Sequence, residues 1–191
     1  MAAQILVEKK KLDKPPLTIH LLGDKTLRQT AKRISKVDDE LRKTIREMLQ
    51  TMYSSDGIGL AASQVGIHKQ LIVIDCEVEN PAAPPLVLIN PEIKKCSQSL
   101  CKDQEGCLSI PGIYMDVERP DQIEVSYKNE HGRPKILKAD GLLARAIQHE
   151  MDHLHGVLFV DHITDSLSLT EELKKKGFSI QAVKPINNGA K

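Results

Sequence analysis

The chain has 191 residues, which suits a single domain with a core of its own. Apolar residues make up 40% and charged residues 28%, and the formal net charge is +1, so no charge imbalance points to nucleic acid or to an acidic membrane. The chain has no Trp, two Phe and three Tyr, too few aromatic rings for a base-stacking surface. We therefore expect no specific binding of nucleic acid.

The N-terminus shows no targeting signal, and no apolar run approaches the roughly 20 residues of a membrane helix. Residues 1–16 carry Glu8 and Asp13, which a transit peptide would avoid. We expect a flexible arm over 1–16, one catalytic domain over 17–184 and a disordered tail over 185–191. The expected location is the cytoplasm of a bacterium or the interior of an organelle, without membrane contact.

The cysteines form no CxxC pair, so they do not match a zinc ribbon. They are Cys76, Cys96, Cys101 and Cys107. A reducing compartment disfavours disulfides. Each cysteine is therefore expected to be either a small core residue or a single functional ligand.

The first predicted element is a helix over residues 38–53, which Asp38 or Asp39 can cap. Its apolar residues recur at helical spacing: Leu41, Ile45, Met48, Leu49 and Met52. This stripe predicts an amphipathic core helix whose methionines serve packing.

A loop rich in small residues, 54–66, follows that helix. Short β-branched runs over 70–75 and 86–90 predict two buried strands. Residues 123–127 alternate apolar and polar side chains, and a turn connects them to 135–140, which predicts a hairpin.

A second long helix is predicted over 139–156, with Asp140 as N-cap and Gly156 as C-cap. A short helix over 169–176 and a last strand over 178–183 complete the order. Helices and strands do not alternate as in βαβ units, so the order predicts the α+β class.

This second helix contains the sequence HEMDH. His149 and His153 stand at i and i+4, so both imidazoles project from one face and can reach a single ion. Glu150 completes the H-E-x-x-H pattern, in which two histidines bind a metal and the carboxylate handles the proton of water. The competing interpretation is a polar helix face turned to solvent, but the apolar neighbours favour a buried edge and a metal site.

A catalytic metal needs a third ligand, and three patterns compete for it. The pattern H-E-x-x-H-x-x-G-x-x-H fails because its last position is Phe159, which cannot ligate. A glutamate farther along would be Glu171 or Glu172, which look like ordinary charges on an exposed helix; such a site would belong to an endopeptidase. The third candidate is Cys107, upstream.

Cys107 lies between Gly106 and Pro111, which predicts a constrained turn where the backbone can come close to another group. A thiolate there would give a Cys/His/His site with one open position. A different hypothesis is a structural metal module for binding a partner, closed by a fourth ligand such as His155 or His162.

The run GIGLAASQVG, 57–66, resembles a dinucleotide fingerprint, but a helix precedes it and a strand follows it, the reverse of what nucleotide binding needs. Gly57 and Gly59 instead expose the backbone to an extended peptide. Gln64 can offer a side-chain N–H.

Three motifs therefore stand in order: GIGLAASQ (57–64), EGCLS (105–109) and QHEMDHL (148–154). Together they resemble the motifs of the peptide deformylases, which remove the formyl group from the N-terminal methionine of new peptides. The resemblance extends over roughly residues 17–165. It implies an α+β fold with mixed or antiparallel sheets around the motif helix, and a metal-dependent amidase that releases formate.

The resemblance also implies roles for single residues. The metal ligands would be Cys107, His149 and His153, and Glu150 would be the general acid and base. The backbone N–H of Leu108 and the amide of Gln64 would hold the oxyanion. The residues in contact with the substrate would be Ile58, Gly59, Leu142 and Ala146. One divalent cation is implied, with Fe(II) as the first choice and Zn(II), Ni(II) or Co(II) as substitutes.

The partners implied are formyl-methionyl nascent peptides, met at the ribosome by a monomer. At Arg145 the sequence departs from members that carry an aliphatic residue, so no role follows for it. The C-terminal segment resembles the subtype with a short terminal strand.

Overall fold

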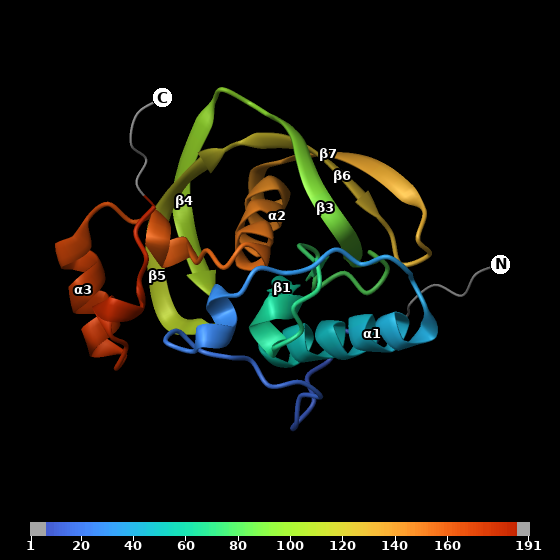
Figure 1. The fold of residues 1–191 in the computed structure, drawn as a ribbon, viewed down its shortest axis with the longest axis horizontal. Helices are drawn as coiled ribbons and strands as arrows, with labels where there is room; N and C mark the ends of the chain where they lie inside the picture. The colour runs from blue at the N-terminus through green and yellow to red at the C-terminus, as the bar shows by residue number, and fades with distance from the viewer. Residues whose placement is uncertain (1–6, 187–191) are drawn as a thin grey trace.

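The computed structural model describes residues 7–186, which form two antiparallel sheets and three α-helices (Figure 1). The strands are β1 (Gly59–Ala61), β2 (Leu71–Ile74), β3 (Leu86–Cys96), β4 (Leu100–Cys107), β5 (Ile110–Pro120), β6 (Gln122–Lys128) and β7 (Pro134–Asp140), and the helices are α1 (Asp39–Ser54), α2 (Gly141–Leu154) and α3 (Ser166–Lys175). One sheet has the order β1-β2-β3-β6-β7, and β4 and β5 form the other. The predicted α+β class is confirmed. No helix in this range is long and apolar enough to cross a bilayer.

Helix α1 forms where the sequence predicts it. The Asp38 carboxylate accepts the backbone N–H of Leu41, so it satisfies one of the free donors at the helix start. The predicted apolar stripe is buried against β1 and β2: Leu41, Ile45, Met48, Leu49 and Met52. The helix therefore positions the loop that follows it, 55–58, at the edge of the first sheet.

Helix α2 lies between the five-stranded sheet and the β4–β5 hairpin, as Figure 1 shows in the centre of the view. Asp140 occupies the N-cap position, but its side chain makes no capping bond, contrary to the expectation. At the other end His155 is the C-cap, and Gly156 follows in the left-handed region at φ +73°.

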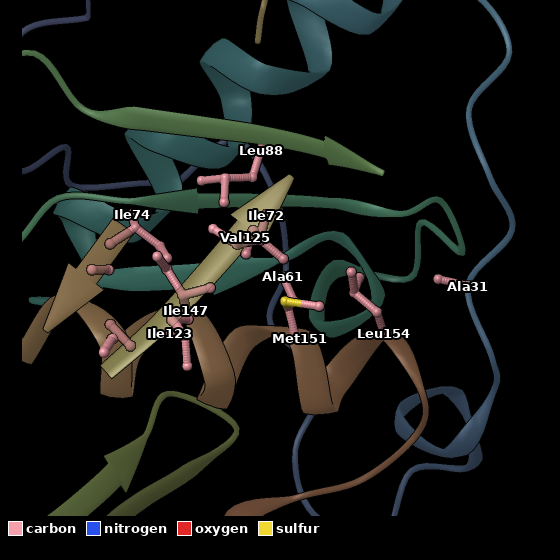
Figure 2. Close-up of a cluster of buried hydrophobic side chains, with 13 residues drawn as sticks. Ala31, Ala61, Ile72, Ile74, Leu88, Ile123, Val125, Ile147, Met151 and Leu154 are labelled. Atoms are coloured by element: carbon pink, nitrogen blue, oxygen red, sulfur yellow. The ribbon is translucent and has the colours of Figure 1, made fainter. Parts of the chain in front are cut away.

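The core beneath the first sheet packs α2 against the strands (Figure 2). Ile147, Met151 and Leu154 point from the helix toward apolar side chains of β2, β3 and β6. Those strand residues are Ile72, Ile74, Leu88, Ile123 and Val125. Each such side chain contributes about 1.5–3 kcal/mol on full burial, so this contact fixes the position of α2.

The hairpin β4–β5 was not predicted. Five of the eight residues of β4 are exposed from the start of the strand, so the apolar alternation that marks a half-buried strand is absent. Strand β3 also extends the predicted 86–90 to Cys96, and β1 lies within the predicted loop 54–66.

The predicted last strand, 178–183, is wrong. A short 3₁₀ turn, Ile180–Ala182, takes its place. Ser179 caps that turn by accepting the N–H of Gln181, a local bond that competes with an extended conformation. Residues 1–6 and 187–191, parts of the expected arm and tail, lie outside the described residues.

Candidate metal centre

Three potential metal ligands meet between α2 and the end of β4. His149 and His153 project from one face of α2, and Sγ of Cys107 lies 3.3 Å from Nε2 of His153. One donor atom of each residue lies within 4.8 Å of those of the other two. Among residues 7–186 this is the one group of three or more such side chains. The structure thus brings together the three residues that the sequence proposes as ligands.

The position of Cys107 follows from the tight end of the hairpin. Cys107 pairs with Ile110 after a shift in register, so the chain turns within two residues. The Cys107 sulfur accepts the backbone N–H of Ser109 at 3.4 Å, a bond that holds the side chain in place. At Gly106 a Cβ would lie 2.4 Å from the Tyr114 ring, so the glycine permits the close approach expected of it.

The two imidazoles are held in different ways. Nδ1 of His149 bonds to the Glu105 carboxylate at 2.9 Å, which leaves Nε2 for a ligand. Nδ1 of His153 is buried without a partner in the described residues, and burial lowers the pKa of this ring, which keeps it neutral. Phe159, which cannot ligate, stacks on His149 with ring centroids 6.0 Å apart.

Glu105 is the centre of a buried ion-pair network that the sequence did not reveal. Arg119 contacts both of its oxygens, at 2.6 and 3.0 Å, and Arg145 donates to one of them at 2.8 Å. Burial alone would raise the pKa of Glu105, but hydrogen bonds from His149 and Arg119 hold it well below its usual range. Glu105 therefore remains an anion and fixes the orientation of His149. In the sequence, only the position of Glu105 in the EGCLS motif indicates that it belongs to the site.

Arg145, without a predicted role, links α2 to both strands of the hairpin. Its guanidinium donates to the carbonyls of Cys101 in β4 and Val117 in β5, at 2.7 and 2.9 Å. Since it also donates to Glu105, this one side chain connects the element that carries Cys107 with the helix that carries His149.

Glu150 lies beside the three ligands and is 5% exposed. Its Oε2 is buried without a hydrogen-bond partner in the described residues. Burial raises the pKa of its carboxyl to about 7, and a nearby cation would lower it again. At Gly59 a Cβ would lie 2.4 Å from Oε1 of Glu150, so β1 approaches α2 closely because this position is glycine.

Gln64 has its amide fixed by three contacts. Its Oε1 accepts the N–H of Ala61 at 2.8 Å, which directs Nε2 toward the site. Nε2 donates to Ser109 Oγ at 3.1 Å and reaches the sulfur of Cys107 at 3.5 Å. A buried amide held this way is a preorganised donor.

A cleft of about 590 Å³ opens onto these groups. The predicted substrate contacts all line it, together with Leu108: Ile58, Gly59, Leu142 and Ala146. Ile58 and Leu142 are 37% and 55% exposed, so the mouth of the cleft presents apolar surface to solvent. Apolar walls with a few convergent polar groups are typical of a ligand site.

The alternative ligands lie elsewhere. Glu172 pairs with Lys175 on α3, and neither it nor Glu171 belongs to the donor group. His162 bonds to Asp152 and His155 to a carbonyl of its own helix, so neither joins the group. Within residues 7–186 these side chains do not complete an endopeptidase site or a four-ligand structural site.

Known proteins share both the sequence and the fold. The polypeptide deformylase family model matches residues 16–168. Peptide deformylase 1 of a Nostoc species is 69% identical over 97% of this chain and 100% of its own length. The chain belongs to the polypeptide deformylase family. A Synechocystis peptide deformylase is 63% identical over 97% of this chain and 100% of its own length.

Solved deformylase structures extend the comparison. A peptide deformylase from Synechococcus elongatus, solved in complex with actinonin, is 67% identical, with a TM-score of 0.94 over 97% of this chain and 100% of that chain. The Thermotoga maritima enzyme is 42% identical, with a TM-score of 0.73 over 78% of this chain and 97% of that chain. The protein is therefore a peptide deformylase, a metal-dependent hydrolase that removes the N-formyl group from the methionine of newly made peptides and releases formate.

Proposed function

We propose that Cys107, His149 and His153 are the metal ligands of this deformylase. The observation that supports the proposal is the proximity of their donor atoms, within 4.8 Å of one another. The neutral His153 ring and the fixed tautomer of His149 suit coordination. One soft thiolate and two imidazoles accommodate Fe(II), our first choice, as well as Zn(II), Ni(II) or Co(II).

Glu150 would handle the proton. When bound, a divalent cation supplies Lewis-acid chemistry, which makes water a nucleophile near neutral pH and polarises a carbonyl. The Glu150 carboxylate takes a proton from the attacking water and passes it to the amine that leaves. Its Oε2, which has no hydrogen-bond partner among residues 7–186, can accept that proton.

Gln64 and Leu108 would stabilise the negative charge that develops on the formyl oxygen. The Nε2 of Gln64 already faces the Cys107 sulfur, and Leu108 lines the same cleft. Removing one such preorganised donor costs about 3 kcal/mol of transition-state stabilisation. Both donors sit beside the proposed metal ligands, where the formyl group would react.

The cleft would bind the formyl-methionyl end of a peptide. Ile58 and Leu142 offer an apolar surface for the methionine side chain, and the small side chain of Ala146 lines the same cleft. Strand β1 is an edge of the five-stranded sheet, so an extended peptide can add to it near Gly59. A structural relative binds actinonin, and we expect the same cleft to bind it here.

The domain bounds, the oligomeric state and the location of the enzyme are also proposals. We propose a catalytic domain over 17–184, a range that contains every proposed site residue. The mobility of 1–16 and 185–191 stays a prediction. The enzyme is proposed to act as a monomer on nascent chains at the ribosome, in a bacterial cytoplasm or inside an organelle.

A formate assay on metal-loaded protein tests the proposal. We expect formate from a formyl-Met tripeptide with Fe(II) or Ni(II), and no formate at any metal loading would contradict it. Cys107→Ala is expected to lose both metal and activity, measured by elemental analysis and formate release on one sample. Metal retention with full activity in that variant would remove Cys107 from the proposed ligand set.

A further inference from the structure

Lys9 is a buried lysine in a segment that precedes the part of the chain matched by the family model. Its side chain is 8% exposed, and its Nζ lies 2.7 Å from Oδ2 of Asp75, which is 2% exposed. Nζ also donates to the carbonyls of Glu77 and Asn80, both at 2.9 Å. Three acceptors thus match the three protons of the ammonium group.

Asp75 connects Lys9 to the substrate cleft. The hydroxyl of Tyr53, in the last turn of α1, donates to the Asp75 carboxylate at 2.8 Å. The backbone N–H of Asp75 donates to the carbonyl of Ile58 at 2.8 Å, and Ile58 lines the cleft. The ion pair therefore joins the start of the chain to both ends of the loop 55–58.

Two residues that follow Lys9 also contact the loop 55–58 and the end of α1 before it. The N–H of Leu12 donates to Oγ of Ser54 at 3.1 Å, and Lys11 pairs with Asp56 at 2.6 Å. Asp56 is a non-glycine residue at φ +58°, a conformation that the surrounding contacts must maintain. Ser54 and Asp56 flank the start of the loop, so residues 9–12 contact it at two places.

We infer that Lys9 is a positioning residue that holds the cleft wall formed by Ile58 and Gly59 in place. A buried ion pair adds little net stability compared with apolar residues of similar volume, whereas it fixes geometry at a defined point. Here the ion pair fixes the position of Asp75, whose backbone N–H donates to the carbonyl of Ile58 in the loop. The inference rests on the proposed function insofar as Ile58 and Gly59 contact the substrate.

Lys9→Met tests this inference, with Lys10→Met as the matched control. Lys10 is the next residue, and its side chain pairs within residues 7–186 only with exposed Glu8, so its change leaves the ion pair of Lys9 intact. In Lys9→Met we expect amide hydrogen exchange at residues 57–60 to rise at least ~10-fold while exchange in α2 stays unchanged. We also expect KM for a formyl-Met tripeptide to rise about 5-fold with kcat within about 2-fold.

Two results would overturn the inference: unchanged exchange at residues 57–60, or a KM shift equalled by Lys10→Met. If Lys9→Met fails to fold, Lys9→Met/Asp75→Asn removes the unpaired carboxylate and is judged by the same measurements. If the wild-type protein releases no formate, the proposed function fails. The exchange measurement, which needs no substrate, then decides the inference alone.

Discussion

The buried carboxyl of Glu150 is the group that we propose transfers the proton in the reaction. Replacing it by Gln keeps the shape of the side chain but removes the proton acceptor. We expect Glu150→Gln to bind metal as tightly as the wild type and to lose turnover by about 10²–10⁴-fold. Elemental analysis and formate release on the same preparation measure both effects. A variant of nearly full activity would remove Glu150 from the mechanism.

Arg145 tests whether residues beyond the ligands tune the metal site. We expect Arg145→Met to weaken metal affinity by about 10–100-fold, because Glu105 loses a partner and α2 loses the Arg145 bonds to two hairpin carbonyls. Gln148→Met is the matched control, since the Gln148 amide also ties α2 to the hairpin, through the Pro120 carbonyl, and its hydrogen bonds within residues 7–186 go to backbone carbonyls and not to Glu105. Competition with a chelator measures the affinity. Equal losses of metal affinity in both variants would show that weaker packing of α2 against the hairpin, and not the lost bond to Glu105, causes the effect.

The sequence predicts some residues of the site and not others for a physical reason. The i, i+4 spacing of His149 and His153 is local, so helical geometry alone brings the rings together. The contacts of Glu105 with Arg119 and of Lys9 with Asp75 join strands and segments distant in sequence. Each looks like an ordinary surface charge until the tertiary structure supplies its partner.

At the scale of elements, prediction succeeds where one face is apolar. Helix α1 buries a stripe at helical spacing, α2 is buried over most of residues 144–154, and β2 is buried throughout, so apolar residues mark all three. The hairpin β4–β5 lacks this mark because β4 is mostly exposed, although the turn near Cys107 was predicted from its glycine and proline neighbours. The sequence therefore predicts the turn at Cys107 but not the β4–β5 hairpin that contains it.

The docking of α2 gives a stability prediction. Ile147 is fully buried against the sheet, so Ile147→Ala should lower the free energy of unfolding by about 2–5 kcal/mol. Leu142 lies on the same helix but is 55% exposed, and Leu142→Ala should change that free energy by less than about 0.5 kcal/mol. Urea unfolding measures both. Similar losses would mean that α2 is not held mainly by this packed face.

At the scale of the whole molecule, stability should fall in alkali. Burial and the bond to Asp75 raise the pKa of Tyr53 well above its usual value near 10. Because the folded state favours the neutral phenol, this contribution is complete below about pH 10 and is lost as the pH rises above it. Tyr127, whose pKa burial also raises, acts in the same direction.

Tyr53→Phe isolates this effect. We expect the variant to start from a lower free energy of unfolding at about pH 8, since the bond to Asp75 is gone, and to lose less between about pH 10 and about pH 11 than the wild type does. Urea unfolding across this range provides the measurement. Parallel curves for the two proteins would assign the alkaline loss to other groups.

The sulfur of Cys107 and the two rings of α2 are separated along the chain by β5, β6 and β7. Translation proceeds at roughly 5–20 residues per second, so a newborn molecule carries this thiol for several seconds before either imidazole exists. During that interval neither imidazole can cover the sulfur, so only a reducing environment protects it from oxidation. Until α2 has been synthesised, the proposed metal site therefore lacks two of its three ligands and cannot form.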